Sequence, residues 1–267
     1  MKLHKYIAII LTIILIGGCT LNILIYLPKK EDYYYLQDGL FTVRTEDNET
    51  IYGYFSPAPP NSPFSNITIL FFHGNAISMN TMADTAMLFH DIGVNFIMFD
   101  YRGYGKSTGT PSEEGTYKDA EAIIKYVLSL TNIDTNNIFF LGHSLGTAIA
   151  TEMTLKYKPK ALILAAGFTS IDDMTDYYTT YSFPSSWFVE YKYDTISKIP
   201  NVSVPILFIH GTADQVIPYW MSISNYSRAK EPKKLVLIPN IRHERAYLFT
   251  TQEFRNEIIN FINTYRN

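Results

Sequence analysis

The most constraining feature of the sequence is a short segment in which a strand-like run turns abruptly into a helix-like run. From Ile138 to Ala150 the chain reads Ile-Phe-Phe-Leu-Gly-His-Ser-Leu-Gly-Thr-Ala-Ile-Ala. A serine on a sharp strand-to-helix turn has an exposed hydroxyl, and glycines two positions to either side let neighbouring backbone pass close by. The Gly-x-Ser-x-Gly pattern centred on Ser144 therefore predicts a nucleophile elbow and covalent catalysis by this serine.

Composition limits the size of the fold and the class of partner. The chain has 267 residues, of which 47% are hydrophobic and 18% charged, which suits one large core better than two domains. The net charge of -3 and the isoelectric point near 6.1 provide no basic surface of the kind that nucleic-acid binding needs. We therefore expect one globular domain over residues 39–267 that does not bind nucleic acid.

From residue 67 onward, short apolar runs alternate with amphipathic stretches. This pattern is typical of an α/β fold with a mostly parallel central sheet and helices on both faces. Two earlier strands, Leu40 to Thr45 and Ile51 to Phe55, predict a hairpin. The later predicted strands are Ile67 to Phe72, Asn95 to Phe99, Ile138 to Leu141, Ala161 to Ala165, Ile206 to His210 and Leu235 to Ile238. The predicted helices are Met79 to Asp91, Ser112 to Leu130, Leu145 to Tyr157, Tyr219 to Ser227 and Thr251 to Tyr265.

One connection is too long for a simple loop. The interval 172–204 lies between two predicted buried strands and is rich in aromatic residues, including Trp187 and Phe188. Structureless connections of this length are uncommon in compact domains. We interpret the interval as a small cap whose aromatic side chains wall an apolar acyl site. The alternative is a pair of aromatic helices packed on the core.

A serine nucleophile needs a base, and the chain has six histidines. His243 lies in a loop after the last predicted strand, where it can reach over the carboxyl edge of the sheet, and it is the predicted base. Of the others, His4 lies in the N-terminal segment, and His143 lies beside the nucleophile but faces away. His73 and His210 lie at strand ends before a glycine, and His90 lies in a predicted helix far from the elbow.

The base in turn needs a carboxylate to orient its ring. Asp214 directly follows a predicted buried strand, and the resulting chain order is Ser144, Asp214, His243. An aspartate at such a position can also be only a turn or capping residue. Asp100 is the main rival, but it precedes the nucleophile and would require a different strand order. The predicted triad is therefore Ser144, Asp214 and His243.

An oxyanion formed at the site needs backbone N–H donors. The amide of Leu145, directly after the nucleophile, is one predicted donor. The turn His73-Gly74-Asn75-Ala76 follows the first long strand, and the amide of Asn75 is the other. A glycine-containing turn is also common in ordinary loops.

The N-terminus predicts attachment to a membrane. A short basic start is followed by the apolar stretch Ile7 to Ile16 and by Gly17-Gly18-Cys19. Cys19 is the only cysteine, which excludes an internal disulfide and a cysteine-based metal site. The pattern resembles a bacterial lipoprotein signal over residues 1–18, which implies lipid attachment to Cys19 and an extracytoplasmic domain at the cell envelope. The alternative is an uncleaved anchor, because apolar character continues to Leu27 over about the 20 residues that span a bilayer. In the lipoprotein interpretation, residues 19–38 are a membrane-proximal stalk.

Taken together, these motifs resemble the α/β-hydrolase superfamily of serine hydrolases over residues 66–267. The closest branch is that of small, N-terminally membrane-attached esterases and acyl-protein thioesterases, which share a Tyr-x-Pro element seen here as Tyr26-Leu27-Pro28. The resemblance implies ester or thioester hydrolysis without a cofactor. One departure is Arg242, which stands where glycine often precedes the base. The motifs that carry the resemblance are Phe71 to Ala76, Asp100 to Ser107, the elbow at Ser144, His210 to Pro218, and His243.

These observations predict a membrane-attached serine hydrolase that acts on apolar, lipid-like acyl substrates through an acyl-serine intermediate, with no metal or cofactor. A serine peptidase acting on short peptides is the alternative enzyme, since the same triad and fold serve amide hydrolysis. A catalytically silent binding module is the alternative from another class, and its signature would be a missing member of the triad.

Overall fold

A single eight-stranded sheet organises the computed structural model, which describes residues 25–36, 38–179, 190–244 and 249–266. The strand order is β1-β2-β4-β3-β5-β6-β7-β8. The first two strands form an antiparallel hairpin and β2 is antiparallel to β4, whereas all neighbouring strands from β4 to β8 are parallel. The prediction of a mostly parallel sheet is confirmed. The strands are β1 (Leu40–Arg44), β2 (Thr50–Ser56), β3 (Thr68–Phe72), β4 (Asn95–Phe99), β5 (Ile138–His143), β6 (Ala161–Ala165), β7 (Ile206–Gly211) and β8 (Lys233–Ile238).

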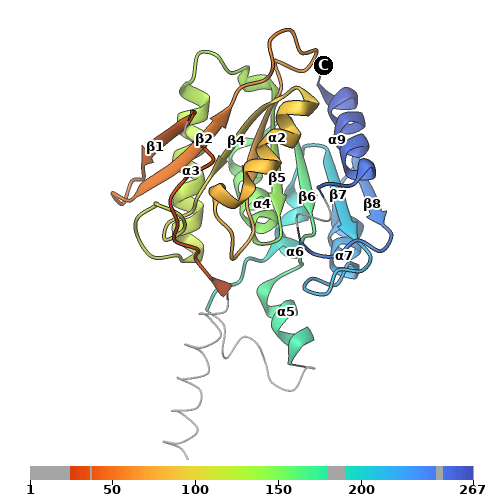
Figure 1. Ribbon diagram of the computed structural model, residues 1–267. Coiled ribbons are helices and arrows are strands. Elements are labelled where there is room, and N and C mark those ends of the chain that lie inside the picture. Colours follow the sequence, from red (N-terminus) through yellow and green to blue (C-terminus); the bar gives the residue numbers. More distant parts are fainter. Residues whose placement is uncertain (1–24, 37, 180–189, 245–248, 267) are drawn as a thin grey trace, which may run out of the picture.

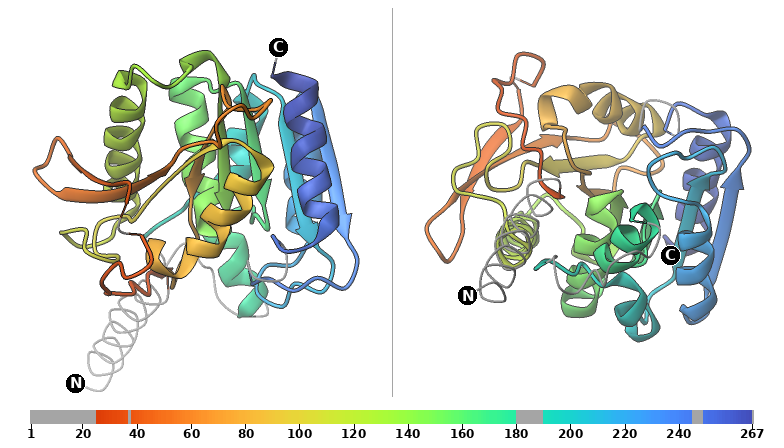
Figure 2. Two further views of the ribbon diagram at one scale, coloured as in Figure 1. Left: turned by 45° about the horizontal axis from the view of Figure 1, so that its top comes forward. Right: turned by 90° about the horizontal axis from the view of Figure 1, so that it is seen from below.

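Helices cover both faces of this sheet (Figures 1 and 2). Residues of α2 and α9 belong to one core cluster, and residues of α3, α4 and α7 belong to the other. The helices are α2 (Ala83–Ile92), α3 (Glu113–Ser129), α4 (Leu145–Tyr157), α5 (Ile171–Tyr178), α6 (Thr195–Lys198), α7 (Trp220–Arg228) and α9 (Gln252–Tyr265), and the 3-10 turns are η1 (Met79–Met82), η2 (Thr135–Asn137) and η4 (Ile199–Asn201).

The strand sequences explain the two cores. In β3, Leu70 and Phe72 face one cluster while Ile69 and Phe71 face the other, and all four side chains are buried. Because side chains alternate between the faces of a strand, a sheet covered on both sides needs an unbroken apolar run. The central strands therefore read as continuous apolar segments, which is the pattern that the sequence shows.

The helix predicted over residues 79–91 is divided into η1 and α2. The amide of Met79 donates a hydrogen bond to Asp100 Oδ1 (2.8 Å), and the side chain of Asn80 accepts hydrogen bonds from the amides of Tyr34 and Tyr35. Contacts to distant parts of the chain thus fix this first turn in a tighter geometry than that of the α-helix that follows. Elsewhere the predicted helices differ by a residue or so at their ends.

Residues 25–36, predicted to belong to a stalk, lie against the folded domain. Tyr26, Tyr33 and Leu36 are buried, and the Tyr33 hydroxyl donates a hydrogen bond to Asp100 Oδ2 (2.6 Å). Within the described part of the chain, each helix is too short or too polar to cross a membrane. The predicted signal of residues 1–18 and the lipid-attachment residue Cys19 lie outside the described residues.

The predicted cap is described only in part, because residues 180–189, including Trp187 and Phe188, lie outside the described ranges. Its first portion is α5, which lies at the end of the sheet where β5 and β7 finish (Figure 1). Its last portion returns to the core, since Tyr193 is fully buried and its hydroxyl lies 2.7 Å from Thr116 Oγ1 in α3. The described aromatic residues of this interval are therefore divided: Tyr193 packs in the core, whereas Tyr178 is exposed on α5.

Candidate active site

Ser144 occupies a strained turn between β5 and α4. Its φ and ψ angles are 54° and -120°, a region that non-glycine residues rarely adopt and that stores strain at functional sites. Its amide donates to the carbonyl of Ala165 in β6 (3.0 Å), which fixes the turn to the sheet. A Cβ at Gly146 would stand 1.9 Å from the Phe72 carbonyl oxygen, and one at Gly142 would stand 2.5 Å from the Gly146 oxygen. The two glycines are thus required for helix and strand to approach so closely.

The structure brings the three predicted triad residues together. The Ser144 hydroxyl lies 3.1 Å from His243 Nε2, and His243 Nδ1 lies 2.7 Å from Asp214 Oδ2. The residues come from the segments that follow β5, β7 and β8, all at the same edge of the parallel sheet. With Nδ1–H donating to the carboxylate, Nε2 is left to accept the serine proton, which is the tautomer that a general base needs.

The environment of Asp214 keeps it ionised. Its side chain is fully buried, and burial alone would raise its pKa. Hydrogen bonds from His210 and His243, the charge of a protonated His243 and the amide of Ile217 outweigh burial and hold the pKa well below its usual value. The amides of Val216 and Ile217 donate to Oδ1 at 2.8 and 2.7 Å. Asp214 therefore presents a fixed negative charge to the His243 ring.

His210 supports Asp214, a role that sequence reasoning did not assign to it. Its Nε2 lies 3.0 Å from Asp214 Oδ2 and its Nδ1 lies 2.7 Å from the Ser222 hydroxyl. The sequence pattern placed His210 only at a strand end before a glycine. The spacing of four residues between His210 and Asp214, across a turn, was the one available signal.

The two predicted oxyanion donors belong to residues that line one cavity with Ser144. This cavity has a volume of about 340 Å³, and both Asn75 and Leu145 contribute to its wall. Leu145 is the first residue of α4, where N–H groups have no partner within the helix. The loop carrying Asn75 comes close because Gly74 has no side chain: a Cβ there would stand 3.0 Å from Ser144 Cβ.

The rest of the cavity wall is predominantly apolar. Ile25 comes from the N-terminal segment, Ile171 and Met174 come from α5, and Ile217 follows Asp214. None of the described lining residues carries a formal charge. The complete described lining is Ile25, Asn75, Ser144, Leu145, Phe168, Ile171, Met174, Thr175, Tyr178, Val216 and Ile217.

Asp100, the rival carboxylate, serves a different location. It is fully buried beneath Tyr33 and Met79, and its Oδ1 lies 3.5 Å from Nε2 of the buried His73. Burial raises the pKa of Asp100 to about 7 and lowers that of His73 to about 4. The Asp100 carboxylate lies with Tyr33, Met79 and His73, whereas Asp214 contacts His243, so the geometry favours Asp214.

His143 and Arg242 lie beside the base without belonging to the triad. The His143 ring packs behind the His243 ring with centroids 5.5 Å apart. Arg242 is absent from the described lining of the cavity, and its guanidinium donates to Gln215 Oε1 (3.0 Å). The unusual residue before the base therefore connects two loops beside the triad.

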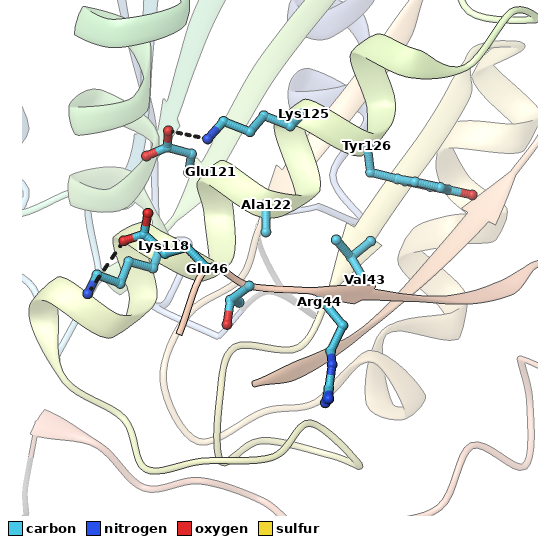
Figure 3. A pocket seen from close by; sticks show the side chains of 9 residues that line it. Val43, Arg44, Glu46, Lys118, Glu121, Ala122, Lys125 and Tyr126 are labelled. Atoms are coloured by element: carbon cyan, nitrogen blue, oxygen red, sulfur yellow. Dashed lines mark ion pairs between the residues drawn. The ribbon is translucent and has the colours of Figure 1, made fainter. Parts of the chain in front are cut away.

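A second, larger cavity of about 430 Å³ lies between β1 and α3 (Figure 3). Five charged side chains line it, and four of them are paired with one another: Lys118 with Glu46, and Lys125 with Glu121. None of the triad residues reaches it. Over the described part of the chain, no group of three or more histidine, cysteine or acidic side chains is arranged to hold a metal ion.

Comparison with known proteins places this geometry in context. A family model described as serine aminopeptidase, S33, matches residues 65–193. An uncharacterized protein of Mycobacterium tuberculosis is 30% identical over 220 residues, which span 82% of this chain and 77% of that protein. The uncharacterized protein YfhR of Escherichia coli K12 is 32% identical over 223 residues, or 81% and 78% of the two chains. Human alpha/beta hydrolase domain-containing protein 17B is 29% identical over 250 residues, or 87% and 83%.

Solved structures show the same fold at lower sequence identity. The Pyrococcus furiosus esterase Pf2001 superposes with a TM-score of 0.74 at 18% identity, covering 91% of this chain and 97% of that one. Est1E of Butyrivibrio proteoclasticus, solved with ferulic acid bound, superposes with a TM-score of 0.69 at 18% identity, covering 85% and 99%. The overall fold is therefore shared with these two solved structures.

Proposed function

Because this chain belongs to the α/β-hydrolase superfamily, we propose that it is a serine hydrolase that cleaves ester or thioester bonds of apolar acyl substrates. The observation that carries the proposal is the pair of hydrogen bonds linking Ser144, His243 and Asp214 at the wall of an apolar cavity. Such a constellation is recognised by its geometry and the roles of its members. The presence of all three members disfavours a catalytically silent binding module.

The geometry supports a two-step course for the proposed reaction. His243 Nε2 takes the proton of Ser144 as the serine oxygen attacks the acyl carbonyl, and the negative charge that develops on the carbonyl oxygen is held by the amides of Asn75 and Leu145. His243 then gives the proton to the departing alcohol or thiol, leaving an acyl-serine. A water molecule, deprotonated by His243, attacks this ester and the acid departs as Ser144 regains its proton. Asp214 stabilises the charged ring at each step.

The cavity wall supports an apolar acyl group. Val216, Ile217 and the α5 residues Ile171 and Met174 offer hydrocarbon surface beside Ser144. An aminopeptidase must also bind the ammonium group of its substrate, for which a carboxylate is the usual partner. Among the described lining residues there is no carboxylate, so the site favours the acyl substrate. The family description as serine aminopeptidase keeps short peptides as the second candidate substrate class.

We also propose that the enzyme acts at a membrane of the bacterial cell envelope. The support is the sequence pattern of residues 1–19, with a basic start, an apolar stretch and Gly17-Gly18-Cys19. Growth with a labelled fatty acid should label the wild-type protein and leave Cys19→Ala unlabelled. An unlabelled wild-type protein would remove the lipoprotein form of the proposal and leave the uncleaved anchor.

The substrate proposal is tested with a panel of p-nitrophenyl esters, acyl thioesters and aminoacyl p-nitroanilides. The wild-type protein is expected to hydrolyse the esters or thioesters, and Ser144→Ala and His243→Ala are expected to lose nearly all of this activity while retaining the folded state. Ser129→Ala, which alters an exposed serine at the end of α3, is the matched control and should behave as wild type. Turnover confined to the anilides would favour the peptidase, and wild-type turnover in His243→Ala would contradict the assigned base.

A further inference from the structure

The side chain of Asn75 is held by one contact within its own loop and two from outside it. Its Oδ1 accepts hydrogen bonds from the amide of Leu27 (2.7 Å), the hydroxyl of Tyr104 (2.7 Å) and the amide of Ala76 (2.8 Å). An amide oxygen has two lone pairs, so three donors at these distances satisfy it fully. The orientation of the Asn75 side chain is therefore fixed jointly by the N-terminal segment and by the loop after β4.

The turn that carries Asn75 is conformationally costly. Ala76 has a φ angle of 60°, in the left-handed region, which costs of the order of 1 kcal/mol for a residue with a Cβ. Such a conformation persists when surrounding contacts over-determine it. The Ala76 amide donates to Asn75 Oδ1, so it is held by an atom that Leu27 and Tyr104 also fix. The three hydrogen bonds together are therefore contacts that maintain this conformation.

The N-terminal segment is firmly attached where it meets this loop. The Tyr26 hydroxyl lies 2.5 Å from the Tyr193 hydroxyl, and both residues are buried. Burial raises the pKa of Tyr26, so its hydroxyl remains neutral and can both donate and accept. Further along, the amide of Gly105 donates to the carbonyl of Lys29 (2.8 Å), and Tyr33 binds Asp100. The Leu27 amide is thus presented to Asn75 from a fixed backbone.

We propose that the Leu27 amide and the Tyr104 hydroxyl are positioning groups that hold Asn75 as an oxyanion donor, which makes residues 25–36 a required part of the active site. This inference rests on the proposed function. Oxyanion donors act only when they are correctly placed, and a displacement of about 1 Å costs about 10²-fold in rate. Ile25, two residues before Leu27, lines the same cavity as Ser144, so the segment contributes to the acyl site as well.

The chain offers a matched pair of variants for a test. Leu27→Pro removes the amide hydrogen, whereas Leu27→Ala keeps it; the side chain is half exposed, so shortening it has little effect on packing. In the full-length protein, Leu27→Pro and Tyr104→Phe are expected to lower kcat about 10- to 100-fold with KM unchanged, and Leu27→Ala, which keeps the amide donor, is expected to lose far less kcat than Leu27→Pro. Because Asn75→Ala lacks the acceptor, adding Leu27→Pro to it should cause no further loss.

Hydrogen exchange measured by mass spectrometry provides a readout that does not depend on activity. A peptide covering residues 73–80 should take up deuterium faster in Leu27→Pro than in Leu27→Ala. Equal uptake, equal kcat in the two Leu27 variants, or a full Leu27→Pro loss in the Asn75→Ala background would overturn the positioning role. Failure of the proposed function has a different signature, which is unchanged hydrolysis in Ser144→Ala.

Discussion

Replacing Gly74 with alanine would insert a methyl group between the loop after β3 and the nucleophile. The added Cβ would stand 3.0 Å from Ser144 Cβ, 3.2 Å from His143 Nδ1 and 3.3 Å from the His143 carbonyl oxygen. Ordinary contacts begin at 3.4 Å, so the loop must withdraw by about 0.4 Å from Ser144 (3.4 minus 3.0). The backbone at Gly74 lies outside the left-handed region, so alanine can adopt it and the protein should fold.

The expected effect falls on the chemical step. Since a misplacement of about 1 Å costs about 10²-fold, a withdrawal of a few tenths of an ångström should lower kcat about 3- to 10-fold, which is up to about 1.4 kcal/mol of transition-state stabilisation. The substrate cavity is otherwise unchanged, so KM should stay near the wild-type value. Steady-state kinetics on a p-nitrophenyl ester, together with thermal unfolding of each variant, measures both quantities.

Gly167→Ala is the matched control for this experiment. Its added Cβ would be equally crowded, at 3.1 to 3.3 Å, but against the side chain of Thr147 in α4. If Gly167→Ala lowers kcat as much as Gly74→Ala, general crowding near the elbow explains the result and the argument from the Asn75 loop fails. A wild-type kcat in a folded Gly74→Ala would refute it as well.

Three further predictions concern stability and selectivity. Asp214→Asn should have a lower free energy of unfolding than wild type at pH 7, measured by urea denaturation. A carboxyl group whose pKa is depressed in the folded state stabilises the fold above its unfolded pKa of 3.8. The difference in unfolding free energy between the two proteins should therefore become smaller as the pH falls below 3.8. Phe254→Ala removes a buried ring stacked on Phe249 and should cost about 3–5 kcal/mol in chemical denaturation while the folded fraction keeps its kcat. Met174→Trp fills part of the cavity and should lower the octanoate-to-acetate ratio of kcat/KM about tenfold or more; an unchanged ratio would mean that acyl chains bind elsewhere.

Patterns within single segments predicted the elements well. The bounds of β4, β6 and α4 agree with the sequence analysis to the residue, because unbroken apolar runs and small helix-compatible residues specify buried strands and the helix behind them. The order of Ser144, Asp214 and His243 followed from where each lies relative to a strand end. Parallel strands end at a common edge, so local positions were enough to bring these three residues together.

Contacts between distant segments were beyond the reach of such patterns. Residues 29–36 look polar because they begin with four charged side chains, yet Tyr33 is buried with Asp100 as its partner. Tyr26, just before them, is buried with Tyr193. Buried hydroxyls are tolerated only when they are hydrogen-bonded, and the partners lie far away in the sequence. The division of residues 79–92 between η1 and α2 has the same origin.

Labelling with a fluorophosphonate probe, followed by mapping of the modified peptide by mass spectrometry, tests the central claim most directly. The full-length protein carries the N-terminal segment that holds the Asn75 loop, and it is compared with Ser144→Ala and Asp214→Asn. The account predicts modification at Ser144 in the wild type, none in Ser144→Ala, and slowed labelling in Asp214→Asn. A folded wild-type protein that stays unlabelled, or one labelled equally with and without Ser144, would contradict an activated serine at this site.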